Sequence, residues 1–257
     1  MFFDSHAHFD DDKFEEDRYE VIEKCYNEGI TNIITAGYSI KSSACALEIA
    51  NKYDFIYSTA GISPNDINGD LKQIKECINQ IYKMAQNEKV VAIGEIGLDY
   101  YWNKENMDVQ KYTFKKQIEI ANRLNKPIVI HTREAVMDTL EIIKENEVNK
   151  KGVFHCCPLN RELVKEALKL GYYISFAGPI TFKNSKNADE IINLVPIDKI
   201  LIETDSPYLA PEPVRGTRNN SINVKHIAEK ISKVKGIDLK DIAKITKENT
   251  KKIFEIK

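Results

Sequence analysis

Six side chains that can bind metal ions follow short apolar runs in this sequence. They are His6, His8, Glu95, His131, His155 and Asp205. Imidazole nitrogens and carboxylate oxygens are ligands that zinc, manganese and magnesium take in proteins. Any one of these residues, considered alone, would more often have a structural role than bind a metal ion. Four of the five histidines in such positions are hard to explain by packing, so the set indicates a metal centre.

The spacing and number of these residues predict how the ions are shared. In extended chain, residues two apart point to the same side, so His6 and His8 can chelate one ion. Six ligands exceed what one catalytic ion with an open position needs, so we predict two divalent ions: magnesium, manganese or zinc. Glu95 has two oxygens and is the natural bridge between them. Such ions lower the pKa of water from about 16 toward 7, and Asp205 is our candidate to take the proton.

Eight short β-rich runs alternate with longer segments of helical period. The runs are residues 2–4, 32–36, 55–60, 90–95, 128–131, 153–155, 172–176 and 200–203. Several are continuously apolar, as expected for strands that are covered on both faces of a parallel sheet. The helical segments include 13–28, 71–86, 108–125 and 161–170, with Gly171 as a C-cap, and 222–256 is predicted to form two closing helices.

This alternation predicts the fold class. The chain has 257 residues, close to the roughly 250 of one (β/α)8 barrel, and the connections are too short for a second domain. We therefore predict an α/β fold with one TIM barrel domain over residues 1–257, while pattern alone leaves an open doubly wound sheet as an alternative. Barrel enzymes carry their reactive groups at the C-terminal ends of the strands, where these six ligands would meet.

Composition limits the classes of function. Apolar residues make up 42% of the chain, and no apolar run approaches the roughly 20 residues that cross a bilayer, so we expect no membrane role. Residues 1–6 lack the pattern of a secretory signal, and the five scattered cysteines are odd in number, so we expect reduced thiols and a cytoplasmic protein. A net charge of −2 gives no global attraction to a polyanion, so nucleic-acid binding would need a local basic surface or bound metal.

Candidate substrate contacts lie on the same predicted rim. Arg133 and Arg218 could neutralise a phosphate, although a salt bridge is a comparable explanation for Arg133. Tyr100, followed by aromatic residues at 101–102, could form a wall on which bases or sugars stack. It is equally plausible that the aromatic rings only pack the loop and that Asp99 caps a helix.

Five motifs, in order along nearly the whole chain, resemble those of the TatD family of metal-dependent deoxyribonucleases, which are amidohydrolase-like barrels. The motifs are DSHAH at 4–8, IGEIGLDY at 93–100, HTREA at 131–135, FHC at 154–156 and ETDSPYLAP at 203–211. The resemblance implies a (β/α)8 barrel, two divalent ions and hydrolysis of DNA phosphodiesters, commonly from the 3′ side. Single-stranded DNA or frayed ends would be the substrate, and we expect a monomer.

The resemblance also implies roles for individual residues. One ion would be held by His6, His8 and Asp205 and the other by His131 and His155, with Glu95 shared between them.

Three departures from the family pattern bear on substrate preference. Where the family has His-Pro after the third strand, this chain has Ser63-Pro64. Residues 157–159 (Cys-Pro-Leu) replace Phe-Ser-Gly, and Thr217 stands in place of a lysine in segment 216–221. None of them removes a predicted metal ligand.

Two other functions compete with DNA hydrolysis. The same barrel could hydrolyse an ester, lactone, amide or aminoacyl bond. Related barrels bridge their metals with a modified lysine, however, and the presence of Glu95 counts against the amide-ring hydrolases. A non-catalytic metal or nucleic-acid binding protein is the third possibility, and the full ligand set counts against it.

Overall fold

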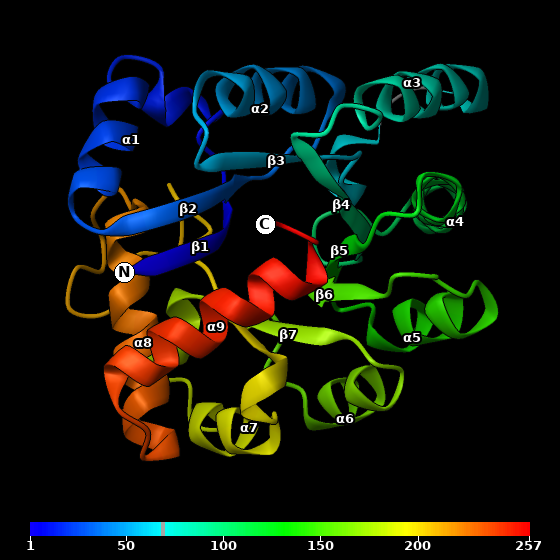
Figure 1. Cartoon of the computed structure of the whole chain (residues 1–257). Helices are drawn as coiled ribbons and strands as arrows, with labels where there is room; N and C mark the ends of the chain where they lie inside the picture. Colours follow the sequence, from blue (N-terminus) through cyan, green and yellow to red (C-terminus); the bar gives the residue numbers. More distant parts are fainter. Residues whose placement is uncertain (68–69) are drawn as a thin grey trace.

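The computed structural model describes residues 1–67 and 70–257, and its framework is an eight-stranded parallel sheet with strands in chain order (Figure 1). The strands are β1 (Phe2–Ala7), β2 (Ile30–Thr35), β3 (Ile56–Ala60), β4 (Val90–Asp99), β5 (Ile128–Arg133), β6 (Gly152–Phe154), β7 (Tyr173–Phe176) and β8 (Ile200–Ile202). A parallel bridge between Ala7 and Ser206 joins the last strand region to the first. The predicted (β/α)8 barrel is confirmed, and the open sheet is excluded.

Helices surround the barrel and follow its strands. They are α1 (Arg18–Asn27), α2 (Ile40–Lys52), α3 (Leu71–Met84), α4 (Met107–Leu124), α5 (Val136–Glu145), α6 (Arg161–Lys169), α7 (Ala188–Leu194), α8 (Val224–Lys235) and α9 (Leu239–Ile253). The first helix begins later than predicted, because residues 12–14 form a separate 3-10 turn that the Asp11 side chain caps. Gly171, with φ of +91°, follows the last residue of α6 and its cap, Leu170. None of the helices described in 1–67 and 70–257 is long and apolar enough to span a membrane.

Alternation along the strands decides which side chains enter the barrel. In β5 and β6, Val129 and Val153 point into the inner apolar layer, whereas Ile128 and Phe154 belong to the outer core. Side chains two residues apart share a face, so His131 and His155 continue the inner row toward the C-terminal end. The same rule applied to Leu201 puts Glu203 inside the barrel.

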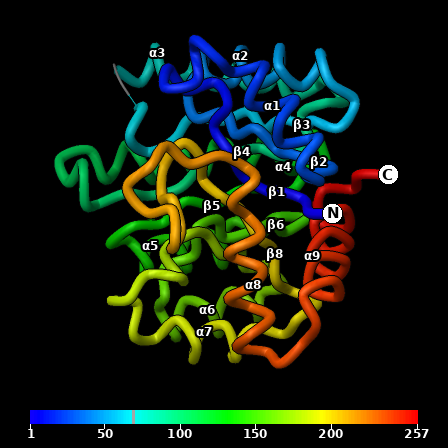
Figure 2. Tube along the Cα trace, turned by 90° about the vertical axis from the view of Figure 1, so that its left-hand side faces the viewer, coloured from blue at the N-terminus to red at the C-terminus, as the bar shows by residue number. Residues whose placement is uncertain are grey.

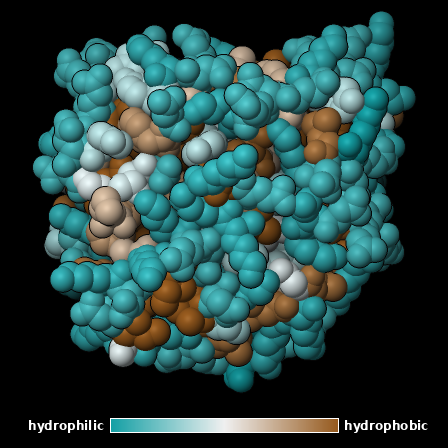
Figure 3. Space-filling model, in the orientation of Figure 1, coloured by the Kyte–Doolittle hydropathy of each residue, from teal (hydrophilic) through white to brown (hydrophobic). Residues whose placement is uncertain are grey.

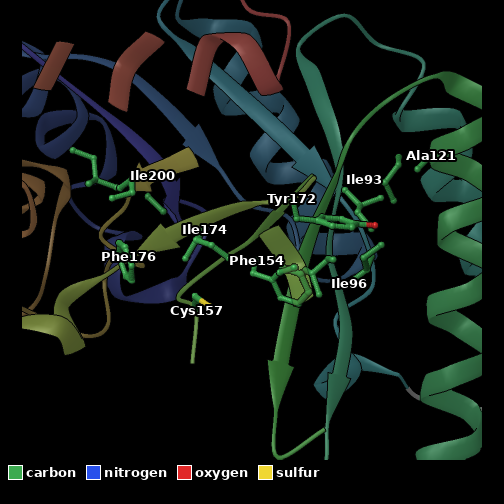
Figure 4. Packing of buried hydrophobic residues seen from close by; sticks show 14 of the residues in the cluster. Ile93, Ile96, Ala121, Phe154, Cys157, Tyr172, Ile174, Phe176 and Ile200 are labelled. Atoms are coloured by element: carbon green, nitrogen blue, oxygen red, sulfur yellow. The ribbon is translucent and has the colours of Figure 1, made fainter. Parts of the chain in front are cut away.

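The outer core lies between the strands and the ring of helices. Figure 4 shows part of it, where Ile93 and Ile96 of β4 lie near Phe154, Tyr172 and Ala121 of α4. The rings of Phe154 and Tyr172 meet edge to face, with centroids 5.6 Å apart. Burial of this kind, worth roughly 1.5–3 kcal/mol per large apolar side chain, stabilises the frame that carries the polar inner row.

The two ends of the barrel differ. At the N-terminal end, α9 crosses the strands, and Phe254 and Ile256 join the inner apolar layer (Figure 1). Figure 3 shows that this end is mostly hydrophilic, with scattered hydrophobic residues. At the opposite end, seen on the left of Figure 2, lies the long orange loop that follows β8. The C-terminal ends of the parallel strands meet there, and they carry the candidate site.

Candidate metal centre

The first ligand group contains His6 of β1, His8 directly after that strand, and Asp205 in the loop after β8. Nε2 of His8 lies 3.2 Å from Oδ1 of Asp205 and 3.2 Å from Nε2 of His6. The backbone fixes this arrangement, because the N–H of Asp205 donates to the carbonyl of His6 at 2.9 Å. The three ligand atoms all lie within 4.8 Å of one another, close enough to hold one ion.

Glu95, His131 and His155 form the second ligand group. Oε1 of Glu95 lies 3.0 Å from Nδ1 of His131 and 3.5 Å from Nε2 of His155. Close packing of β4 on β5 allows this approach, since a Cβ at Gly97 would lie only 2.0 Å from the carbonyl oxygen of His131. These ligand atoms also lie within 4.8 Å of one another.

Glu95 connects the two groups. Its second oxygen, Oε2, lies 3.4 Å from Nε2 of His6 and 3.8 Å from Nε2 of His8. Strand β4 runs on to Asp99, four residues past the predicted end, and its register with β5 shifts between Ile93 and Ile96. Glu95 therefore lies within the strand, not at its end, and its buried carboxylate faces both groups.

In three of the histidines, the ring nitrogen that points away from the ligand group lies next to a protein oxygen atom. Nδ1 of His8 lies 3.1 Å from the carbonyl of Ala36, and Nδ1 of His155 lies 3.2 Å from Oε1 of Glu203. For His131 the partner is Asp99, whose Oδ2 lies 3.0 Å from Nε2. Such partners fix the ring orientation of metal-binding histidines and leave the other nitrogen free to bind.

The two carboxylates among these partners, Glu203 and Asp99, were not predicted as site residues. Glu203 lies inside the barrel, within a third ligand-competent group with His6 and His155. The alternation from Leu201 to Glu203 was the signal that could have identified it. Asp99, which we considered as a helix cap, is the last residue of β4; it accepts backbone N–H groups of the loop that follows and faces His131.

Electrostatics keep the central carboxylate charged. Burial alone would raise the pKa of Glu95, but the imidazoles of His155 and His131 hold it well below its usual range. Burial lowers the pKa of His8, whereas the hydrogen bond and charge of Asp205 outweigh burial and raise it to about 9. His6 has its pKa lowered by burial, and its Nδ1 is buried with no hydrogen-bond partner among the described residues. Clustered imidazoles that face ionised carboxylates are a donor set that fits divalent cations.

A buried aspartate supports the loop that carries Asp205. Asp4 accepts hydrogen bonds from the backbone N–H of Thr204 at 2.9 Å and from its hydroxyl at 2.6 Å. Burial raises the pKa of Asp4 to about 7, although these hydrogen bonds lower it. Asp205 is thereby held between the first strand and the last.

Two of the three residues predicted to contact substrate, Tyr100 and Arg218, interact with other protein side chains in the structure. Tyr100 is 9% exposed, packs in the outer core and donates its hydroxyl to Asp138 at 2.7 Å, so it forms no wall at the centre. Arg218 forms a double ion pair with Asp17, a pairing that sequence could not reveal across 201 positions. Arg133 is exposed, and its guanidinium lies 3.8 Å from the ring centroid of Tyr101.

Ser63, where the family pattern has histidine, is connected to the metal centre through the hydrogen bonds of Asn65. Ser63 is buried and accepts the N–H of Asn65 at 3.3 Å. The amide of Asn65 in turn donates to Oδ2 of Asp99 at 3.2 Å. Burial, together with the charge of Glu95, raises the pKa of the next residue, Asp66, to about 6.

Comparison with solved structures supports the class of fold. The chain is similar to YjjV, a TatD homolog from Escherichia coli K12, with a TM-score of 0.92 and 23% identity over 100% of this chain and 98% of that one. It is also similar to a TatD family hydrolase from Entamoeba histolytica, with a TM-score of 0.86 and 22% identity over 98% and 97% of the two chains. The comparison shows the fold of a (β/α)8 barrel, and the side chains gathered at its C-terminal end could hold metal ions.

Sequence comparison identifies the family. A family model described as TatD related DNase matches residues 3–255. The chain is 41% identical to YabD of Bacillus subtilis strain 168, over all of both chains, and 34% identical to YcfH of Escherichia coli K12, over 98% of this chain and 95% of YcfH. Both relatives are described as uncharacterized metal-dependent hydrolases. The chain belongs to the TatD-related DNase family.

Proposed function

We propose that this protein hydrolyses phosphodiester bonds in DNA, from the 3′ end of single-stranded or frayed substrate, with two divalent ions of the magnesium, manganese or zinc type. The observation that carries the proposal is the central position of Glu95, whose two oxygens face two separate histidine groups. The family description, TatD related DNase, supports DNA as the substrate.

Six residues would hold the ions. His6, His8 and Asp205 would hold one, His131 and His155 would hold the other, and Glu95 would be shared between them. Bound divalent ions would lower the pKa of water and offset the charge of a phosphate. The buried outer partners Glu203 and Asp99 would keep the histidine rings fixed while ions exchange.

Asp205 is the proposed proton acceptor. Its side chain is 16% exposed, whereas that of Glu95 is 9% exposed, so Asp205 is more open to the substrate side. The neighbouring imidazoles keep the carboxylate ionised, since they lower its pKa although burial raises it. An ionised carboxylate near the attacking water can accept its proton, and general base catalysis of this type contributes about 10²- to 10⁴-fold.

The test is a cleavage assay with reconstituted protein. End-labelled single- and double-stranded DNA is incubated with protein that holds magnesium, manganese or zinc, and product lengths are followed with a chelator control. We expect a ladder of products that shortens from the 3′ end of single strands and disappears with chelator. Glu95→Gln and Asp205→Asn should abolish this activity with unchanged circular dichroism, and undiminished activity in either variant would refute the assignment.

Two parallel reactions separate the alternatives. A lactone and an aminoacyl-tRNA are offered under the same metal conditions. Hydrolysis of either one, with intact DNA, would replace the proposal by another metallohydrolase activity. DNA binding without cleavage under every ion would indicate a non-catalytic protein.

A further inference from the structure

We propose that Tyr101 and Trp102, together with Arg133, form a platform on which a nucleobase of the substrate stacks beside the metal centre. This inference rests on the proposed function, because it takes the ligand to be a nucleotide of the DNA substrate. It assigns the binding of the base to residues outside the ligand set, in the loop that follows β4.

The two aromatic side chains are unusually exposed for their size. Trp102 is 67% exposed and Tyr101 is 46% exposed, although aromatic rings are normally buried to a large extent. Their rings meet edge to face, with centroids 4.8 Å apart and an interplanar angle of 87°. Exposed aromatic surface at the mouth of a site is where a ligand can stack.

Arg133 adds a positive charge to the same surface. Its guanidinium lies 3.8 Å from the ring centroid of Tyr101 and 5.4 Å from that of Trp102. The neighbouring acid, Glu134, faces Lys104 at 3.7 Å, so the salt bridge considered for Arg133 is made by a lysine instead. An arginine that lies on aromatic rings without an acidic partner among the described residues can still bind a phosphate oxygen.

One buried carboxylate holds this platform to the metal centre. Oδ1 of Asp99 accepts the backbone N–H groups of Tyr101 at 2.9 Å and Trp102 at 3.0 Å, while Oδ2 lies 3.0 Å from Nε2 of His131. The Asp99 side chain has no exposed surface. In addition, β4 and β5 pair Asp99 with Arg133 in register. The three platform residues are therefore positioned by the same elements that carry Glu95 and His131.

These contacts specify the chemistry of the ligand. Every base has a π-face, so a Trp and Tyr pair binds bases with little regard to sequence. Arg133 beside the rings suits the phosphate that belongs to the stacked nucleotide. An unpaired base is required, because a base inside a duplex has both faces covered by its neighbours. The platform thus favours single strands and frayed ends.

The fluorescence of Trp102 tests base stacking directly, because it is the only tryptophan in the chain. The metal-loaded protein is titrated with thymidine 5′-monophosphate, which has no phosphodiester bond to cleave. The matched ligand is 2-deoxyribose 5-phosphate, which has the sugar and phosphate but no base. We expect saturable quenching by the nucleotide and little by the sugar phosphate. Equal quenching by both ligands, or by neither, would overturn the platform.

Variants provide a second readout on cleavage. We expect Trp102→Ala to raise KM for single-stranded DNA by about 5- to 150-fold, the range for loss of one base–aromatic stack. Trp102→Phe should recover most of the loss, and Tyr26→Ala should change nothing, since Tyr26 is 52% exposed but lies at the end of α1 that leads into β2. An oligomer of tetrahydrofuran abasic sites should be cleaved equally by wild type and Trp102→Ala.

The outcomes distinguish the two proposals. Quenching by the nucleotide without cleavage of any DNA would contradict the proposed function and leave the base platform supported. DNA cleavage with an unchanged KM in Trp102→Ala would contradict the platform and leave the nuclease supported.

Discussion

Nδ1 of His155 lies 3.2 Å from Oε1 of Glu203, and both side chains are almost completely buried inside the barrel. The same oxygen also accepts the backbone N–H of Cys156 at 2.6 Å. Glu203 thus fixes both the ring and the backbone at the end of β6, and it turns Nε2 of His155 toward Glu95. A residue outside the proposed ligand set thereby sets the geometry of one ligand.

Glu203→Gln should therefore weaken metal binding without unfolding the protein. An amide keeps the shape of the side chain but supplies no negative charge to the imidazole, and loss of such a partner typically costs about 10- to 100-fold in metal affinity. Calorimetric titration of the metal-free variant with manganese measures the change. Glu190→Gln is the matched control, because Glu190 pairs with Arg161 on the surface. Equal affinities in wild type and Glu203→Gln would show that Glu203 does not support the centre.

Asp99→Asn should affect metal binding and substrate binding together. The carboxylate faces His131 and also accepts two backbone N–H groups of the aromatic loop. We expect a weaker manganese affinity and a higher KM for single-stranded DNA in the same variant. Asp241→Asn, at an exposed position of α9, should alter neither value. A change confined to one of the two constants would mean that Asp99 does not couple the loop to the centre.

Metal ions should stabilise the folded protein, because only the folded chain brings the ligands together. A free ion concentration 100 times Kd adds about 2.7 kcal/mol, which corresponds to roughly 5–10 °C in Tm for a chain of this size. Differential scanning fluorimetry with and without chelator measures the shift. His8→Ala should lose most of it. His226→Ala should keep it, since the ring of His226 faces Glu229 on α8. A metal shift that survives in His8→Ala would contradict the ligand assignment.

A half-buried lysine at the opposite end of the barrel should make stability depend on pH. Burial lowers the pKa of Lys126 to about 8, and its ammonium donates to the carbonyls of Asn87 and Val90. In the unfolded chain a lysine keeps its proton up to about 10.4, so between these values the unfolded state binds more protons, by up to about one. The contribution of Lys126 to stability is therefore least favourable below pH 8 and rises between pH 8 and about 10.4.

Urea unfolding at pH 7.5 and pH 10 measures this contribution. The free energy of unfolding of wild type, relative to Lys126→Met, should increase between the two pH values. Lys225→Met, at an exposed position of α8, should show no such change. A constant difference between wild type and Lys126→Met would mean that the buried ammonium titrates as it does in water.

Much of the barrel could be predicted because its signals are local. All eight strands were predicted near their observed positions. Apolar runs of three to six residues, separated by amphipathic segments, can be recognised from neighbouring residues along the chain alone. Boundaries were less accurate where tertiary contacts decide them. Strand β4 continues to Asp99 because the backbone of residues 96–99 pairs with β5, and that pairing leaves no mark in the local sequence.

The ligands on the inner row of the barrel were predictable because strand alternation is a local signal. The contacts made by the side chains around them were not predictable. His131 and His155 follow from alternation beyond Val129 and Val153. The pairing of Arg218 with Asp17 joins segments 201 positions apart, and the direction of the Tyr100 hydroxyl depends on α5. Side-chain choices of this type depend on which partner the fold brings near, so composition and spacing do not determine them.

The most direct test of the proposed centre is anomalous diffraction from crystals of the protein grown with excess manganese. Two peaks are expected a few ångströms apart, one next to His6, His8 and Asp205 and the other next to His131 and His155, with Glu95 between them. A single peak that touches only one group, or two peaks that are both remote from Glu95, would contradict the shared carboxylate on which the proposed hydrolysis depends.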